Sequence, residues 1–328
     1  MKNRKLGRGV AVVGAGMSKY GCFPGFTTRD IFVEAYKDLL STVDKGIDPR
    51  DIEAFYLGNY SNDIFEGQAH LAPIIANWIG LSPIPSVRLE DACASSSVAF
   101  REGMIAIASG LYDIVLVGGI EKMTDLPISR ITDTLATAAD IPYEVSAGFT
   151  FPGFYASMAT AYMHAYGTNP ETFMKVAIKN HFNGSFNPKA QFGQKITDIM
   201  EIKKENAIKK GKPVPQWKNE IEFLSDDKAN PVIAWPMRLY DCSPVSDGGA
   251  ALLLVSEELA YQFTDDPVFV IGSGAASDGP LHSRSSLTTI PSAKLAANKA
   301  YEMAGVSASD IKLAEVHDCF TIAEIIAT

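Results

Sequence analysis

The sequence lacks any apolar run of the roughly 20 residues that a membrane-spanning helix needs. The apolar run nearest its start, residues 10–13, is too short for the core of a secretory signal peptide. The last residues, 326–328, carry no peroxisomal address. From these absences we expect a cytoplasmic protein.

Cysteine is scarce, and its spacing argues against a disulfide framework and against a zinc site. The four cysteines are far apart and form no CxxC pair: Cys22, Cys93, Cys242 and Cys319. A disulfide framework or a zinc site needs closer pairs, so we expect neither, and a reducing compartment fits better. We expect no metal and no covalently bound cofactor.

Basic residues are outnumbered, because 29 Lys and Arg face 38 Asp and Glu, a formal net charge of −9. Phosphate backbones need a basic surface, so nucleic acid is excluded as a main partner. A local basic patch for an anionic ligand remains open, since net charge does not describe a single groove.

What the chain has is enough apolar residues for large cores, 47% of its 328 residues. Its length suggests two domains or one large α/β unit. Apolar runs that predict strands alternate with segments that predict helices. The predicted strands are residues 10–13, 53–57, 85–89, 113–118 and 250–256, and the predicted helices are residues 28–43, 68–79 and 95–110. This alternation predicts a parallel-rich sheet covered on both faces.

The chain also repeats itself. Residues 10–16, VAVVGAG, are echoed by residues 268–274, VFVIGSG, and residues 46–52 are echoed by residues 305–311. Residues 10–16 and 268–274 each precede a predicted helix, residues 28–43 in the first copy and 290–304 in the second. Residues 46–52 and 305–311 each lead into a predicted strand, residues 53–57 in the first copy and 312–316 in the second. The offsets, 258 and 259, are nearly equal, which favours a duplicated βα unit.

This repeat predicts the domain organisation. Residues 1–123 and 242–262 form a first half, residues 124–241 an inserted cap over a substrate site, and residues 263–328 the start of a second half. The second copy stops early and lacks its own third strand and elbow. A half-built sheet has an open edge, so we expect a chain truncated at its C-terminus unless a partner fills the gap.

Cys93 stands where a cysteine is most reactive. A short strand, residues 85–89, precedes it, and a helix poor in bulky residues follows from Ser95. At such a strand-to-helix elbow, the free N–H groups of the helix start lower a thiol pKa and favour the nucleophilic thiolate. They also offer donors to an oxyanion.

The remaining candidates have plainer interpretations. Cys22, Cys242 and Cys319 are read as inert core cysteines, and His70, His164, His181 and His282 as structural or surface residues. Gly14 and Gly16 could suggest dinucleotide binding, but Lys19 replaces the third glycine and no acidic residue ends the second strand, so a tight strand-exit turn is favoured. The charged run 201–212 is read as a solvated helix face, which could also line a phosphate groove.

Several segments, taken in order, resemble the thiolases of the sterol carrier protein type and the archaeal acetyl-CoA acetyltransferases. DACASSS (residues 91–97) resembles the nucleophile motif, SPVSDGGAA (residues 243–251) the segment that enters the last strand of the first half, and HDCF (residues 317–320) a signature of that subgroup. NPKAQF (residues 187–192) and FPGF (residues 151–154) resemble its loop domain. The resemblance implies an α/β fold of the thiolase type, αβαβα layers made of two similar halves.

The resemblance also implies an activity. Cys93 would take an acyl group from a coenzyme A thioester, and a second thioester would attack it, condensing two acetyl-CoA to acetoacetyl-CoA or, in reverse, cleaving a 3-ketoacyl-CoA. His317 would polarise a thioester oxygen, directly or through a water. A homodimer or tetramer is implied, with lipid metabolism and the mevalonate pathway as context. HMG-CoA synthase and a small zinc-bearing OB-fold protein are implied as possible partners.

One departure leaves an alternative function open. The family's GHPxGATG-like and CxG segments, which supply the activating base and a second cysteine, do not occur in these 328 residues. The alternative is a non-catalytic thiolase-like subunit that binds coenzyme A thioesters or scaffolds a partner. A retro-aldol relative ranks lower, since that group tends to dispense with the cysteine that stands here as Cys93.

Overall fold

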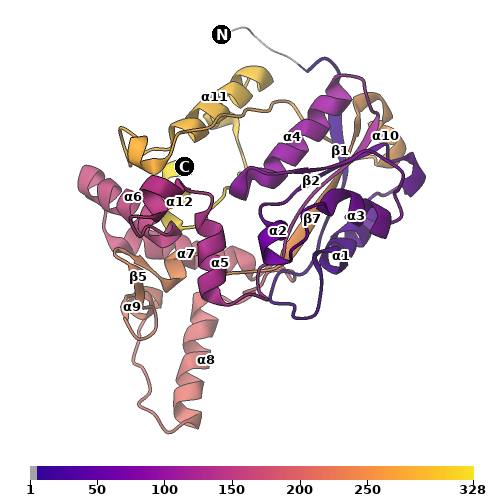
Figure 1. Ribbon diagram of the computed structural model, residues 1–328. Coiled ribbons are helices and arrows are strands. Elements are labelled where there is room, and N and C mark those ends of the chain that lie inside the picture. The colour runs from indigo at the N-terminus through magenta and orange to yellow at the C-terminus, as the bar shows by residue number, and fades with distance from the viewer. Residues whose placement is uncertain (1–5) are drawn as a thin grey trace. The chain divides into compact units, whose positions relative to one another are not determined.

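The computed structural model describes residues 6–328, and the chain divides into two compact units (Figure 1). Of the described residues, the first unit contains 6–134, 245–275 and 295–310, and the second contains 135–244, 276–294 and 311–328. No helix among residues 6–328 is long and apolar enough to cross a membrane. Because the units interleave along the chain, each is assembled from segments distant in sequence.

The first unit is built on one six-stranded sheet of order β3-β2-β4-β7-β1-β8. Its elements are β1 (Val10–Met17), α1 (Thr28–Ser41), β2 (Ala54–Gly58), α2 (Asn62–Phe65), α3 (Leu71–Trp78), β3 (Ser86–Leu89), α4 (Ser95–Ala108), β4 (Ile114–Glu121), β7 (Gly248–Ser256), α10 (Ala260–Phe263) and β8 (Val268–Phe269). The predicted strands and helices of this part all occur, with bounds shifted by a few residues.

The sheet is mixed, so the prediction of a parallel-rich sheet is only partly right. β2 pairs in parallel with β3 and with β4. The strand β7 runs antiparallel to both β4 and β1, and β8 is antiparallel to β1. An apolar run buried on both faces does not reveal its direction, which explains the error.

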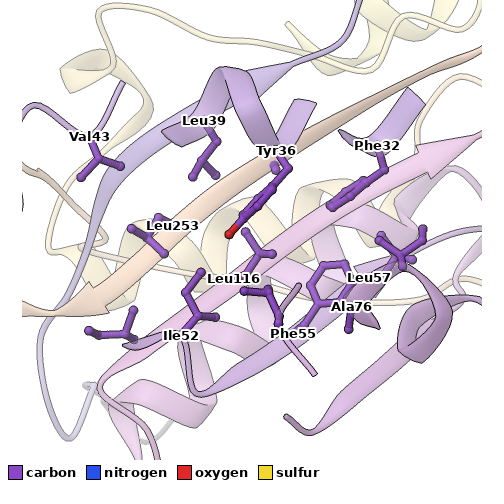
Figure 2. Close-up of a cluster of buried hydrophobic side chains, with 14 of the residues drawn as sticks. Phe32, Tyr36, Leu39, Val43, Ile52, Phe55, Leu57, Ala76, Leu116 and Leu253 are labelled. Carbon is purple, nitrogen blue, oxygen red and sulfur yellow. The ribbon is translucent and has the colours of Figure 1, made fainter. Parts of the chain in front are cut away.

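Helices cover both faces of this sheet. On one face, α1 and α3 pack against β2, β4 and β7, and side chains such as Phe32, Leu39, Phe55 and Leu116 interdigitate there (Figure 2). On the other face, α4 packs through Met104 and Ile107 against a second apolar cluster. Three layers result, and the predicted coverage of both faces is confirmed.

The repeat is visible in how its glycines are used. A Cβ on Gly16 would lie 2.4 Å from the Ala35 oxygen, in α1, and one on Gly274 would lie 1.9 Å from the Ala296 oxygen, in α11 (Pro291–Ala304). In both copies the glycine therefore lets the following helix approach its backbone. Gly14 and Gly16 lie inside β1, so the prediction of a strand-exit turn is wrong.

The second match of the repeat also recurs in structure. Gly46 and Gly305 both adopt a left-handed φ, +76° and +71°, and each precedes a 3-10 helix, Pro49–Asp51 and Ala308–Asp310. The correspondence ends there. The first copy enters β2, whereas residues 311–318 form no regular element, so the predicted strand 312–316 is absent. Of residues 268–274, which echo the start of β1, only Val268–Phe269 form a strand, β8.

The second unit is mainly helical. Its elements are α6 (Phe151–Tyr166), α7 (Pro170–Gly184), α8 (Ile196–Lys209), α9 (Glu220–Ser225), β5 (Val232–Ala234), β6 (Met237–Arg238) and α12 (Thr321–Ala327). α5 (Ile128–Ala136) and α11 run across the division between the units. The helix α7 contributes to two apolar clusters. Phe173 packs with α6 and α12 in one, and Met174 packs with α8 and α9 in the other.

The amino end of α4 lies directly on the sheet. A Cβ on Gly58 would lie 2.4 Å from the Ser96 nitrogen, and one on Gly119 would lie 1.9 Å from the Ser96 Oγ. Gly58 and Gly119 are paired neighbours at the carboxyl ends of β2 and β4. Two paired glycines thus make the space in which α4 begins.

A buried carboxylate ties the strand ends of the first unit together. Asp247, fully buried, accepts hydrogen bonds from the backbone N–H groups of Phe23, Met123 and Thr124, from the Thr124 hydroxyl, and from the Lys122 ammonium at 3.0 Å. Burial alone would raise the pKa of Asp247, but these donors outweigh burial and lower it.

Replacing this carboxylate is expected to destabilise the fold. Asp247→Asn leaves the buried Lys122 charge without its buried partner, so the free energy of unfolding in urea should fall by about 3 kcal/mol at neutral pH. The pKa of Asp247 is lowered by folding, so the difference from wild type should shrink as the pH falls below about 4. The control is Asp125→Asn, the half-exposed second partner of Lys122, expected to cost less than about 1 kcal/mol. Equal losses in both variants would contradict this account.

Filling the space at Gly58 is expected to displace α4. In Gly58→Ala the new methyl meets backbone atoms of Ser95 and Ser96, which cannot rotate away, so urea denaturation should show a loss of about 2 kcal/mol. Gly153→Ala in α6 is the control, because its Cβ would meet no atom closer than 3.6 Å. The account fails if Gly58→Ala is as stable as that control.

Candidate functional site

Cys93 lies at a strand-to-helix elbow, as the sequence predicts. The strand β3 ends at Leu89, Ala92 adopts a left-handed φ of +47°, a 3-10 turn covers Ala92–Ala94, and α4 begins at Ser95. A left-handed backbone is unfavourable for alanine, by roughly 1–2 kcal/mol. The surroundings must therefore hold the elbow in this shape.

Side chains next to the nucleophile hold it. The Ser95 hydroxyl donates to the Ala92 carbonyl at 2.6 Å and accepts from the Asp91 N–H at 2.9 Å. The Glu90 carboxylate accepts from the Ala92 N–H at 2.6 Å. These bonds close a loop around the strained residue, and Cys93 itself remains exposed. The DACASSS segment thus supplies the elements that present its own cysteine.

Desolvation opposes the thiolate that the helix start is expected to favour at this site. Although the residue as a whole is exposed, the protein around the sulfur desolvates it and so raises the pKa of the Cys93 thiol, with a smaller contribution from the Glu121 charge. The opposing hydrogen bond comes from the N–H of Cys93 itself. Cys93 lies in the 3-10 turn that runs directly into α4.

Glu121, which we did not predict from the sequence, ends β4 beside this elbow. Its carboxylate accepts hydrogen bonds from the Tyr60 N–H at 2.8 Å, the Ser61 N–H at 3.3 Å and the Asn59 amide at 3.1 Å. Burial raises the pKa of Glu121 to about 7 despite these donors and the nearby Arg88. The available signal was an acidic residue closing an otherwise apolar strand, residues 114–121.

His317, the second predicted site residue, is exposed and lies in the second unit, in the segment without regular structure. The residues after it are anchored. Asp318 accepts a hydrogen bond from the Asn180 amide, and the Cys319 carbonyl accepts one from the Ser243 N–H at 3.0 Å. Phe320 stacks on Tyr155. The structure therefore anchors the residues that follow His317, and the meeting of Cys93 with His317 stays a prediction.

Two cavities open in the second unit. One, of about 210 Å³, is bordered by Ser243 and Asp318, next to the anchored segment. The other, of about 490 Å³, is lined by aromatic residues that include Phe151 and Tyr155 and by charged residues that include Glu144, Asp278 and Arg284. A lining of apolar and charged side chains together suits a ligand with an apolar body and a polar end.

The other cysteines and histidines differ in environment. Burial raises the pKa of Cys242 to about 12, which agrees with an inert thiol, and Cys319 packs with Cys242 against the same apolar cluster. Cys22 is exposed, so its assignment to the core is wrong. His282 contacts the buried Glu144 carboxylate at 3.2 Å.

The remaining predicted surface groups are more exposed. His181 is half-buried, His70 and His164 are exposed, and residues 201–212 are mostly solvated, in α8 and just beyond it. The prediction of a solvated face for this charged run is confirmed.

Known families match most of the chain. Residues 10–258 match the thiolase N-terminal domain, and residues 274–328 match a thiolase C-terminal domain-like family. The chain is 41% identical to an acetyl-CoA acetyltransferase of Methanothermobacter thermautotrophicus, over 98% of this chain and 76% of that protein. It is 28% identical to sterol carrier protein 2 of Gallus gallus, over 97% of this chain and 55% of that protein.

A similarity in structure accompanies these matches. A solved structure described as the Ltp2–ChsH2(DUF35) aldolase superposes with a TM-score of 0.73 at 22% identity, covering 99% of this chain and 76% of that one. This likeness shows the fold alone. The matches of both thiolase domains and the 41% identity establish that the chain belongs to the thiolase family, close to the archaeal acetyl-CoA acetyltransferases, and that its α/β fold is of the thiolase type.

Proposed function

We propose that this chain catalyses thiolase-type acyl transfer between coenzyme A thioesters through an acyl-Cys93 intermediate, with acetyl-CoA as the acyl donor. The observation that carries the proposal is the elbow, which presents an exposed cysteine at the carboxyl end of a sheet in a family of acyltransferases. The 41% identity to an archaeal acetyl-CoA acetyltransferase supports the substrate.

The chemistry requires two steps. In the first, the Cys93 sulfur attacks the thioester carbonyl, loses its proton, and the coenzyme A thiol leaves. In the second, a carbanion formed at the α-carbon of another thioester attacks the acyl-cysteine and releases the sulfur, giving a 3-ketoacyl-CoA. The reverse sequence is thiolytic cleavage. Each addition places negative charge on a carbonyl oxygen, which a hydrogen-bond donor can stabilise by roughly 3 kcal/mol.

His317 is the proposed donor. The two residues after it are anchored by the Asn180–Asp318 and Ser243–Cys319 hydrogen bonds, which supports a fixed position for its imidazole. The raised pKa of the Cys93 thiol adds a requirement, because the elbow alone does not generate the thiolate. A base must accept the thiol proton as acylation begins.

The acyl-enzyme is the direct test. After incubation with acetyl-CoA, we expect the Cys93 peptide to gain one acetyl group in mass spectrometry, and Cys93→Ala to lose acyl turnover by at least about a thousandfold. The exposed Cys22 serves as the matched control, since Cys22→Ala should retain both labelling and turnover. No mass gain at Cys93 with turnover intact in Cys93→Ala would refute the proposal.

A second candidate function is that of a thiolase-like subunit that works with a partner protein. A solved structure with the same fold is described as an aldolase with a DUF35 component, and a 28% identical relative in Thauera aromatica is named a subunit of benzoylsuccinyl-CoA thiolase. HMG-CoA synthase and a zinc-bearing OB-fold protein remain the proposed partners. Full turnover by a partner-free form would exclude this role.

We also propose a homodimer formed through β3. This strand is the edge of the sheet and pairs with β2 as its one strand neighbour among the described residues, so one row of its backbone groups has no strand partner there. The exposed Val87 lies at its centre. A second copy placed edge to edge would pair those groups.

The dimer makes a measurable prediction. Light scattering after size exclusion should give twice the chain mass for wild type and a single-chain mass for Val87→Lys, because a lysine at a strand edge opposes pairing. Leu111→Lys, at a more exposed apolar position after α4, should remain dimeric. A wild type of single-chain mass would contradict the proposal.

A further inference from the structure

Glu121 is a partly buried carboxyl group that the acyl-transfer steps above do not use. It closes β4 two residues after Gly119, and alternate residues of a strand share a face. Ser96, at the start of α4, lies against Gly119 on that face. Glu121 is therefore on the side of the sheet where α4 and the Cys93 elbow sit, just beyond the strand's end.

The carboxyl group is fixed there. The N–H groups of Tyr60 and Ser61 and the amide of Asn59 donate to it, and the Asn59 amide also donates to the Ile120 carbonyl at 2.8 Å. Asn59 is itself buried. The loop after β2 thus holds both oxygens of the Glu121 carboxylate, and its charge is the smaller of two causes that raise the pKa of the Cys93 thiol.

The other charges near the two groups come from three elements. Arg88 of β3 donates to the Asn59 and Tyr60 carbonyls and pairs with Asp63 of α2. Glu90 and Asp91 precede the nucleophile in the elbow. Glu90 is held by the Ala92 N–H.

Lys122, the residue after Glu121, pairs with Asp247 and Asp125 instead. Arg88 is thus the cation that acts on Glu121, and it does not outweigh the effect of burial.

We propose that Glu121 is a positioning residue for the nucleophile: its carboxylate, held at the end of β4, disfavours the Cys93 thiolate and so sets the pH range in which Cys93 reacts. When Glu121 is neutral this restraint is absent, and when it is ionised the thiol stays protonated to higher pH. The inference rests on the proposed function only in taking Cys93 as the nucleophile.

The experiment measures thiol chemistry and needs no acyl turnover. The rate of Cys93 alkylation by iodoacetamide is followed by mass spectrometry of the Cys93 peptide, which separates it from the exposed Cys22. Wild type and Glu121→Gln are compared from about pH 5.5 to about pH 9. Failure of the acetyl-labelling test would leave this measurement intact, so the two proposals can fail separately.

The sign of the effect follows from the titration of Glu121 near pH 7. Below that pH both proteins are neutral at position 121, so their rates should agree. At about pH 8.5 the variant should react about threefold faster, because more of its thiol is ionised once the neighbouring carboxylate is removed. Glu102→Gln removes the same charge from a partly exposed site on α4 and should behave as wild type.

Other outcomes overturn the proposal. A rate ratio that is constant with pH would indicate a purely structural effect, and slower alkylation in Glu121→Gln would indicate that Glu121 assists ionisation. If the variant does not fold, the ionisation of Cys93 is followed instead by a pH titration of thiolate absorbance, taken as the difference between wild type and Cys93→Ser. Two inflections then support coupling to Glu121, and a single one-proton curve overturns it.

Discussion

The close approach of α4 to the sheet is the constraint on which the candidate site depends. Gly58 and Gly119 are paired at the ends of β2 and β4, and the backbone of Ser95 and Ser96 occupies the space where their side chains would be. This contact fixes where the elbow ends, and therefore where the Cys93 sulfur lies. The left-handed Ala92 is the conformational cost of reaching that position from β3.

The polar groups at the same edge of the sheet follow from this packing. Asp247, just before β7, forms a buried ion pair with Lys122 and accepts a hydrogen bond from the Met123 N–H after β4. Glu121 accepts a hydrogen bond from the Tyr60 N–H in the loop after β2. Asp247 is fully buried and Glu121 is partly buried, and their pKa values move in opposite directions. Asp247 receives a cation and several donors, whereas Glu121 has donors and the influence of a more distant arginine. Environment thus gives two similar residues different roles.

Much of this could be predicted from the sequence, because local patterns encode it. The pattern of apolar residues predicts the strands and helices around the sheet. The repeated glycines mark the places where a helix approaches a strand, although Gly14 and Gly16 lie inside β1 and not in the turn predicted for them. The elbow at Cys93 was also predicted. Strand direction, the absent strand at residues 312–316 and the ionisation of Cys93 depend on tertiary neighbours. The raised pKa of Glu121 comes from its desolvation in the fold, which one acidic residue in an apolar stretch of sequence does not reveal.

The central claim is that Cys93 carries the acyl group and His317 meets its oxygen. A crystal structure of the protein after soaking with acetyl-CoA tests this most directly. The account predicts continuous density for an acetyl group on the Cys93 sulfur, with the imidazole of His317 within hydrogen-bonding distance of the acetyl oxygen or bridged to it by one water. An unmodified sulfur beside bound thioester, or an acetyl group on another side chain, would contradict it.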